Sequence, residues 1–163
     1  MSALASLYKK LCRELAQAET SAQYHPARQA RQLGETPPAQ AFAAIAQHAI
    51  AVWAGFEVVV GKKTLGIGLG REIGRLFSTT RYLTVDRWMD TQRSYRATLL
   101  GLQHGIDCGR LLAQTADRMN DRALVAWCDE TLARRVELVR LADRELDWFA
   151  DHPEIAVRSI SAQ

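Results

Sequence analysis

The sequence predicts an all-α protein, and three observations indicate it. Only 10 of the 163 residues are Gly and 4 are Pro, so few positions interrupt a helix. Apolar residues recur at intervals of three and four along most of the chain, which is the period of one helical face. Runs in which β-branched or aromatic residues alternate with polar ones are short, so strands have little sequence to form from. We expect one bundle of four long helices over residues 1–153, with a tail at 154–163.

The first helix is expected from Ala3 to Tyr24. Its apolar stripe consists of Leu4, Leu7, Leu11, Leu15, Ala18 and Ala22. Pro26 lacks a backbone donor and its ring clashes with the preceding turn, so we expect a kink or a restart there. A last helical piece then covers residues 27–32, and Gly34 is expected to cap it.

The second helix is expected from Thr36–Pro38, where a capping hydroxyl precedes prolines that suit a first helical turn, to about Val60. Its sequence is apolar nearly all round, which predicts a helix buried on every side in a protein core. A membrane span fits less well, because polar groups in hydrocarbon are costly. The residues that interrupt the apolar run are Gln40, Gln47, His48 and Glu57.

The third helix is expected from about Arg81 to Asn120 and the fourth from about Arg122 to Ala150, because Asn120 and Asp121 favour a turn and a proline follows His152. Between the second and third helices lies a segment rich in glycine. If these two helices run in the same direction, the segment must travel the length of the bundle, for which roughly ten to fifteen extended residues suffice.

Small residues recur at every fourth position of the third helix. They are Ala97, Gly101, Gly105, Gly109 and Ala113. Each mid-helix glycine costs about 1 kcal/mol relative to alanine, so we expect the row to be a packing surface that offsets this cost. The partner is expected to be a tryptophan of the same chain (Trp53, Trp127 or Trp148) or, alternatively, a second subunit or a ligand.

Charge is spread unevenly, although the net charge is only +3. Residues 61–96 hold eight basic groups against three acidic ones, whereas from residue 97 onward eight arginines face eleven acidic residues. Such asymmetry suits self-association or an anionic partner, and a solvated face gives it too. The anion-binding candidates are Arg71, Arg75, Arg81 and Arg87. Few aromatic residues lie among them, so nucleic acid is not the expected partner.

Metal sites in helical bundles take Glu from two helices and Glu-x-x-His from two others, and this chain has no Glu-x-x-His. An irregular metal site would have to draw on Glu14, Glu19, His48, Glu57 and His104. A single His on an apolar helix face is more often a hydrogen-bonded core residue. We therefore expect neither a metal nor another cofactor.

Catalytic chemistry has little support in the sequence. No serine has the surroundings of a nucleophile, and the glycines that follow Val60 lack the spacing of a nucleotide-binding loop. Cys108 and Cys128 lie among apolar residues, where a thiol is usually inert. The three cysteines are an odd number without a Cys-x-x-Cys pair, which favours a reducing compartment, the cytoplasm. We expect a protein that is not an enzyme.

The order of two helices, a long link and two more helices, with the stretches Tyr95–Leu100 and Ala126–Asp129, resembles the bacterial, non-cage branches of the ferritin-like family. The resemblance implies a left-handed bundle with a crossover between its second and third helices, often dimeric and usually holding two irons. Because the ligand motif is absent, the fold carries over and the iron does not.

The leading expectation is therefore a non-catalytic helical protein that acts as a homodimer, through the glycine row or the basic end of the crossover. Two alternatives stay open at this point. One is a metal-binding ferritin-like protein with a non-standard site around His48 and His104. The other is a regulator that binds an anionic partner through the basic region 62–96.

Overall fold

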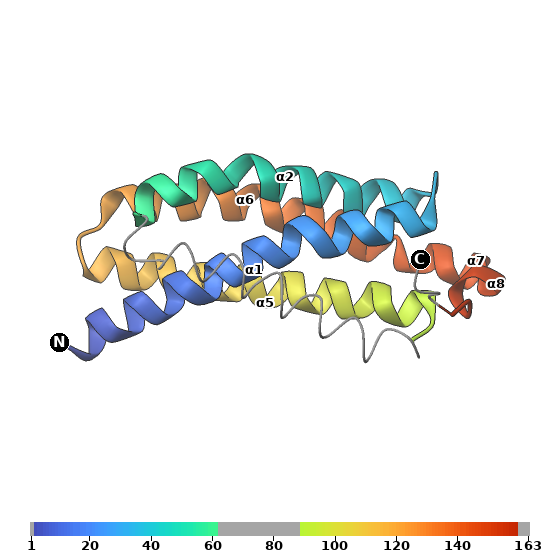
Figure 1. The fold of residues 1–163 in the computed structure, drawn as a ribbon, viewed down its shortest axis with the longest axis horizontal. Coiled ribbons are helices and arrows are strands. Elements are labelled where there is room, and N and C mark those ends of the chain that lie inside the picture. Colours follow the sequence, from blue (N-terminus) through green and yellow to red (C-terminus); the bar gives the residue numbers. More distant parts are fainter. Residues whose placement is uncertain (1, 62–88, 160–163) are drawn as a thin grey trace.

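The described part of the chain is helical almost throughout (Figure 1). The structure is a computed structural model that describes residues 2–61 and 89–159. Within these ranges the only β-type pairing is one isolated bridge between Asp90 and Ser159. The predicted all-α class is confirmed. The glycine-rich link and the four anion-binding candidates, Arg71, Arg75, Arg81 and Arg87, lie outside the described residues.

Four of the described helices are long and two are short. They are α1 (Ala3–Leu33), α2 (Pro37–Val60), α5 (Thr91–Arg118), α6 (Arg122–Arg144), α7 (Leu146–Asp151) and α8 (Pro153–Ala156). A short polar side chain precedes each long helix and accepts a hydrogen bond from the backbone of its first turn. Asp90 accepts from Arg93 N at 2.8 Å and Asp121 from Leu124 N at 3.1 Å. These caps satisfy donors that have no partner within the helix.

Three predicted boundaries are wrong. α1 continues through Pro26 to Leu33, and Pro26 itself is buried. Burial of the ring in the interior offsets the backbone hydrogen bond that a proline cannot make. α5 begins only at Thr91, since Met89 is not helical and Asp90 is the cap. The fourth helix ends at Arg144, after which the chain continues as α7 and α8.

The four long helices lie side by side, and each packs closely against two others. The close pairs are α1 with α2, α1 with α5, α2 with α6, and α5 with α6. α1 and α6 run in one direction, and α2 and α5 run in the other (Figure 1). α2 therefore ends at one end of the array, and α5 begins at the opposite end.

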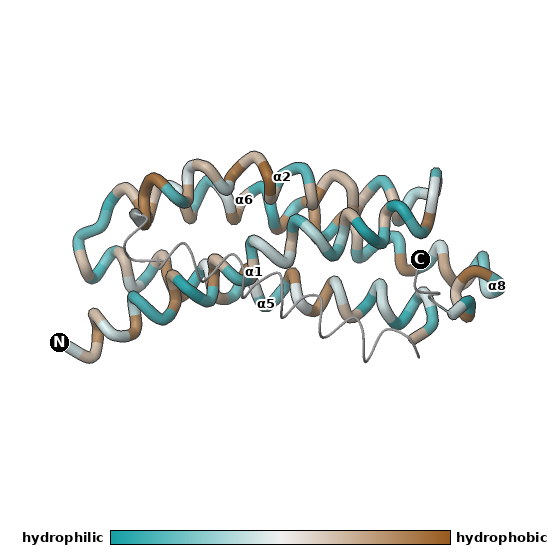
Figure 2. The backbone as a smooth tube through the Cα atoms, viewed as in Figure 1, coloured by the Kyte–Doolittle hydropathy of each residue, from teal (hydrophilic) through white to brown (hydrophobic). Residues whose placement is uncertain are grey.

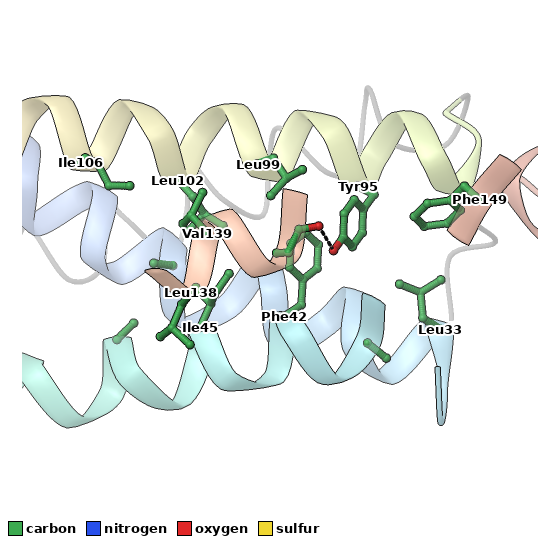
Figure 3. Packing of buried hydrophobic residues seen from close by; sticks show 14 of the residues in the cluster. Leu33, Phe42, Ile45, Tyr95, Leu99, Leu102, Ile106, Leu138, Val139 and Phe149 are labelled. Atoms are coloured by element: carbon green, nitrogen blue, oxygen red, sulfur yellow. Dashed lines mark hydrogen bonds between the residues drawn. The ribbon is translucent and has the colours of Figure 1, made fainter. Parts of the chain in front are cut away.

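The interior consists of two apolar clusters, one towards each end. In the first, Tyr95 stacks on Phe42 with ring centroids 4.0 Å apart and lies 5.1 Å from Phe149 (Figure 3). The Tyr95 hydroxyl donates to Ala142 O at 2.9 Å, so this large buried ring leaves no polar group unpaired. In the second cluster, Phe56 packs beside Trp127, together with the thiols of Cys12 and Cys128.

One side of α2 faces away from this interior, which contradicts the expectation of burial on every side. Val58 is 81% exposed and Ile50 is 61% exposed. The reason is geometric: α2 has only α1 and α6 as close long neighbours, and two neighbours cannot cover a whole helix. Figure 2 shows α2 as a strongly apolar segment at the edge of the array. By length and composition it is the one described helix that could cross a membrane.

Candidate functional site

The most distinctive polar group of the interior is an ion pair between two helices that are not close neighbours. Arg135 on α6 donates from Nη2 to Glu19 Oε2 on α1 at 2.7 Å and from Nη1 to Glu19 Oε1 at 3.2 Å. The two side chains are only 4% and 5% exposed. A two-pronged contact of this kind matches the guanidinium to both carboxylate oxygens and holds their relative orientation.

His48 on α2 completes the cluster. Arg135 Nε donates to His48 Nδ1 at 3.1 Å, so the ring is neutral and carries its own proton on Nε2. Partial burial of the ring, with the positive charges of Arg135 and Arg134, lowers the pKa of His48 from its ordinary 6.5 to about 4. The guanidinium of Arg135 thus donates hydrogen bonds both to the Glu19 carboxylate and to the His48 imidazole.

The helical period explains how these residues reach the interior. Glu19 follows Leu11 and Leu15 at intervals of four on the buried face of α1, and Arg135 lies seven residues after Cys128 on the buried face of α6. Sequence reasoning named Glu19 and His48 and missed Arg135. The missed signal was an arginine at a core position of α6, together with a glutamate at a core position of α1.

This cluster is poorly suited to hold a metal ion. Both carboxylate oxygens of Glu19 and the Nδ1 atom of His48 accept hydrogen bonds from Arg135. The guanidinium of Arg135 therefore occupies the position between these groups that a metal ion would need. A cation entering here would have to displace a fixed positive charge from a buried carboxylate, which is costly. The chemistry of the donor set therefore favours a structural role.

The other metal candidates lie elsewhere. Glu14 on α1 and His104 on α5 approach each other to 3.2 Å at the surface, while Glu57 lies on α2 and is partly buried. The Glu14–His104 pair borders an open groove of about 570 Å³ that Lys9, Lys10 and Arg13 also line. Among the described residues, no three His, Cys, Asp or Glu side chains come together as a metal site.

The row of small residues on α5 winds from solvent into the interior, because each step of four residues turns the helix about 40° beyond a full turn. Ala97 and Gly101 are exposed, Gly105 and Gly109 are buried, and Ala113 is partly buried. A Cβ on Gly105 would lie 3.3 Å from Ala18 Cβ, and one on Gly109 would lie 2.9 Å from a methyl carbon of Leu132.

The glycine contacts correct the expected partners. Ala18 on α1 and Leu132 on α6 fill the positions for which tryptophans were considered, and Trp127 instead lies against Gly55 of α2. A Cβ on Gly101 would meet nothing within 4 Å. The inner half of the row therefore serves packing within the chain, and only Ala97 and Gly101 remain on the surface.

The three thiols are buried in the second core cluster. Burial raises the pKa of Cys12 to about 11 and the pKa values of Cys108 and Cys128 to about 12. Since the thiolate is the reactive form, these cysteines are poor nucleophiles at neutral pH.

The exposed residues of α2 after its first turn are all uncharged. They are Gln40, Gln47, Ile50, Ala51, Ala54 and Val58, and we call them the outer face of α2. Every other long helix carries charged residues among its exposed positions, such as Lys9, Arg93 and Arg134. The outer face of α2 is therefore the second distinctive feature of the described surface.

Comparison with models of protein families, with curated proteins and with solved structures finds no match to this chain.

Proposed function

We propose that the chain is a non-catalytic four-helix bundle of ferritin-like topology that acts through self-association, as a homodimer. Two features support the topology. α2 and α5 run in the same direction (Figure 1), so the end of α2 and the beginning of α5 lie at opposite ends of the array. Each long helix also has two close neighbours, both antiparallel to it, as expected of such a bundle.

The observation that carries the non-catalytic part of the proposal is the Arg135–Glu19–His48 cluster. Proteins of this topology use inward carboxylates and imidazoles to bind metal ions, but here those groups hold a guanidinium instead. The buried thiols offer no reactive sulfur in their place, since their pKa values lie far above neutral. The alternative of a metal site around His48 and His104 has less support, because the two histidines belong to different clusters.

Self-association is supported by the large apolar side chains that remain exposed on the described surface. On the adjacent helices α2 and α6 they are Ile50, Val58 and Leu141. Isolated exposed apolar residues are ordinary, whereas neighbouring ones often mark a contact surface. Sedimentation velocity and light scattering over a wide concentration range test the proposal directly. A dimer free of stoichiometric iron, manganese or zinc is the expected result, and a monomer at every concentration contradicts it.

A second candidate function is binding of an anionic partner. The groove between α1 and α5 presents Lys9, Lys10 and Arg13 against a single carboxylate, Glu14, which adds described cations to the basic region 62–96 of the sequence. Such binding would weaken steeply with salt. A gel-shift or anisotropy titration with a short polyanion, compared between the wild type and Lys9→Ala/Arg13→Ala, tests it. Salt-independent or unchanged binding argues against this function.

A further inference from the structure

The outer face of α2 has the properties of a surface that is covered in the working protein. α2 is 24 residues long, yet only 28% of its most apolar 18-residue window is buried inside the molecule. A core helix of this composition is normally buried over most of its length. The exposed positions Gln47, Ala51, Ala54 and Val58 follow one another at intervals of four and three, so they form one continuous stripe along the helix.

We propose that a second copy of this chain covers the outer face of α2. The inference rests on the proposed self-association and names the surface that mediates it. A two-fold dimer places each residue near the axis close to its own copy, so any charge there meets a like charge. Every exposed residue of α2 from Gln40 to Val58 is uncharged, and the one acidic residue in this span, Glu57, is partly buried. The exposed faces of α1, α5 and α6 do carry charged residues. Charge therefore permits self-contact here more readily than elsewhere on the described surface.

The outer face of α2 offers only about half of the area that each partner buries in a stable dimer. A helix of this length extends about 36 Å, and with a width near 10 Å it offers roughly 360 Å² to a partner. Stable interfaces bury about 800 Å² on each partner, so α2 alone falls short. Leu141 on α6 is 48% exposed and lies two heptads after Trp127, which faces α2 through Gly55. A stable dimer through α2 therefore has to include this neighbouring edge of α6.

The two glutamines of the face distinguish a protein partner from lipid. An amide in hydrocarbon has no hydrogen-bonding partner, which costs a few kcal/mol for each group. Gln40 and Gln47 stand one heptad apart, Gln40 at the N-terminal end of the outer face and Gln47 nearer its middle, so insertion of the whole face into a bilayer would bury both. Across a protein interface the same amides can pair with each other or with backbone groups of the partner.

Variants that introduce a charge on the outer face of α2 test this inference. Ile50→Lys and Val58→Lys place a cation on the face, and Leu100→Lys is the matched control because Leu100 is 73% exposed on α5, which does not pack closely against α2. All three sites are exposed, and circular dichroism with thermal unfolding verifies that each variant folds. We expect Ile50→Lys/Val58→Lys to weaken dimerisation at least tenfold in sedimentation velocity, and Leu100→Lys to leave it unchanged.

The possible outcomes separate this inference from the proposed function. A dimer that withstands Ile50→Lys/Val58→Lys overturns the assignment to α2 and leaves self-association standing. A wild type that is monomeric at every concentration overturns both. Flotation with phosphatidylcholine vesicles tests whether lipid covers the face instead. If the wild type floats with the vesicles and the lysine variants do not, the outer face of α2 binds lipid and the inference is overturned.

Discussion

Arg135 and Glu19 meet across the interior of the molecule, with Nη2 of one and Oε2 of the other 2.7 Å apart, although their helices, α6 and α1, are not among the closely packed pairs. The contact therefore joins opposite corners of the helix array. A buried ion pair gains little net energy over apolar packing, but each of its members is costly when left alone. We therefore expect the pair to specify which helices oppose each other more than it increases stability.

Removal of Arg135 is expected to be far more damaging than removal of the whole pair. Arg135→Met leaves the Glu19 carboxylate buried without a cation, which costs about 3–5 kcal/mol in the free energy of unfolding. In Glu19→Met/Arg135→Met neither charge remains, and most of that loss is expected to return. Urea denaturation followed by circular dichroism measures both. A single variant within 0.5 kcal/mol of the wild type, on the order of an ordinary surface substitution, would show that the pair is not buried as described.

The pKa of His48 makes stability depend on pH in a defined window. Its folded-state pKa of about 4 lies below the ordinary 6.5, so between these values the unfolded chain binds the proton and the folded chain does not. Stability from this group is therefore complete above pH 6.5 and is lost as the pH falls towards 4. After allowance for partial exposure of the ring we expect a loss of roughly 1–2 kcal/mol.

His48→Gln isolates this contribution, because the amide oxygen of glutamine can still accept from Arg135 Nε. The variant should lose less stability than the wild type between pH 6.5 and 4, as measured by urea unfolding at a series of pH values. His104→Gln removes an exposed imidazole on α5 and serves as the control. Parallel pH profiles for the wild type and His48→Gln would refute the assignment of the effect to His48.

The local features of the fold were open to prediction from sequence because they depend on neighbouring residues. Thr36 and Pro37 start α2, and Asp121 caps α6, as side chains of these types dictate. Pro26 was misjudged for the opposite reason. Its effect on α1 depends on packing around it, which no local rule contains.

The cluster at Arg135 and the exposure of α2 were missed for a related physical reason. The helical period shows which residues share a face, but the neighbours of that face come from distant parts of the chain. Arg135 becomes a core residue only because Glu19, 116 positions away, supplies the opposite charge. Val58 is exposed only because α1 and α6 both lie on other sides of α2.

Leucine substitutions at Gly101 and Gly105 are expected to have opposite effects, although the two positions are one turn apart on α5. Gly101 has open space beside it, so Gly101→Leu replaces a poor helix former with a good one and should stabilise the protein by up to about 1 kcal/mol. At Gly105 an added Cβ would lie only 3.3 Å from Ala18 Cβ. The rest of a leucine would force α1 and α5 apart, at a cost of about 2–3 kcal/mol.

Thermal unfolding of Gly101→Leu and Gly105→Leu measures the two effects, and each variant serves as the control for the other. A higher midpoint for Gly101→Leu and a lower one for Gly105→Leu is the expected result. Equal midpoints would mean that Gly105 does not face α1 as closely as described, and the packing role of the inner glycine row would have to be abandoned.

The three native thiols should react with a thiol reagent only when the protein unfolds. With pKa values of about 11 for Cys12 and about 12 for Cys108 and Cys128, roughly one thiol in a thousand or fewer is ionised at pH 8, and burial blocks access to it. Labelling of the folded protein with Ellman's reagent is therefore expected to be slow and to accelerate through the same urea range as unfolding. Gln114→Cys, at an exposed position of α5, provides a thiol that should react at once. A native cysteine that reacts as fast as this control would show that the core around Leu124 and Phe56 opens without global unfolding, because the reagent can reach a buried sulfur only through such an opening.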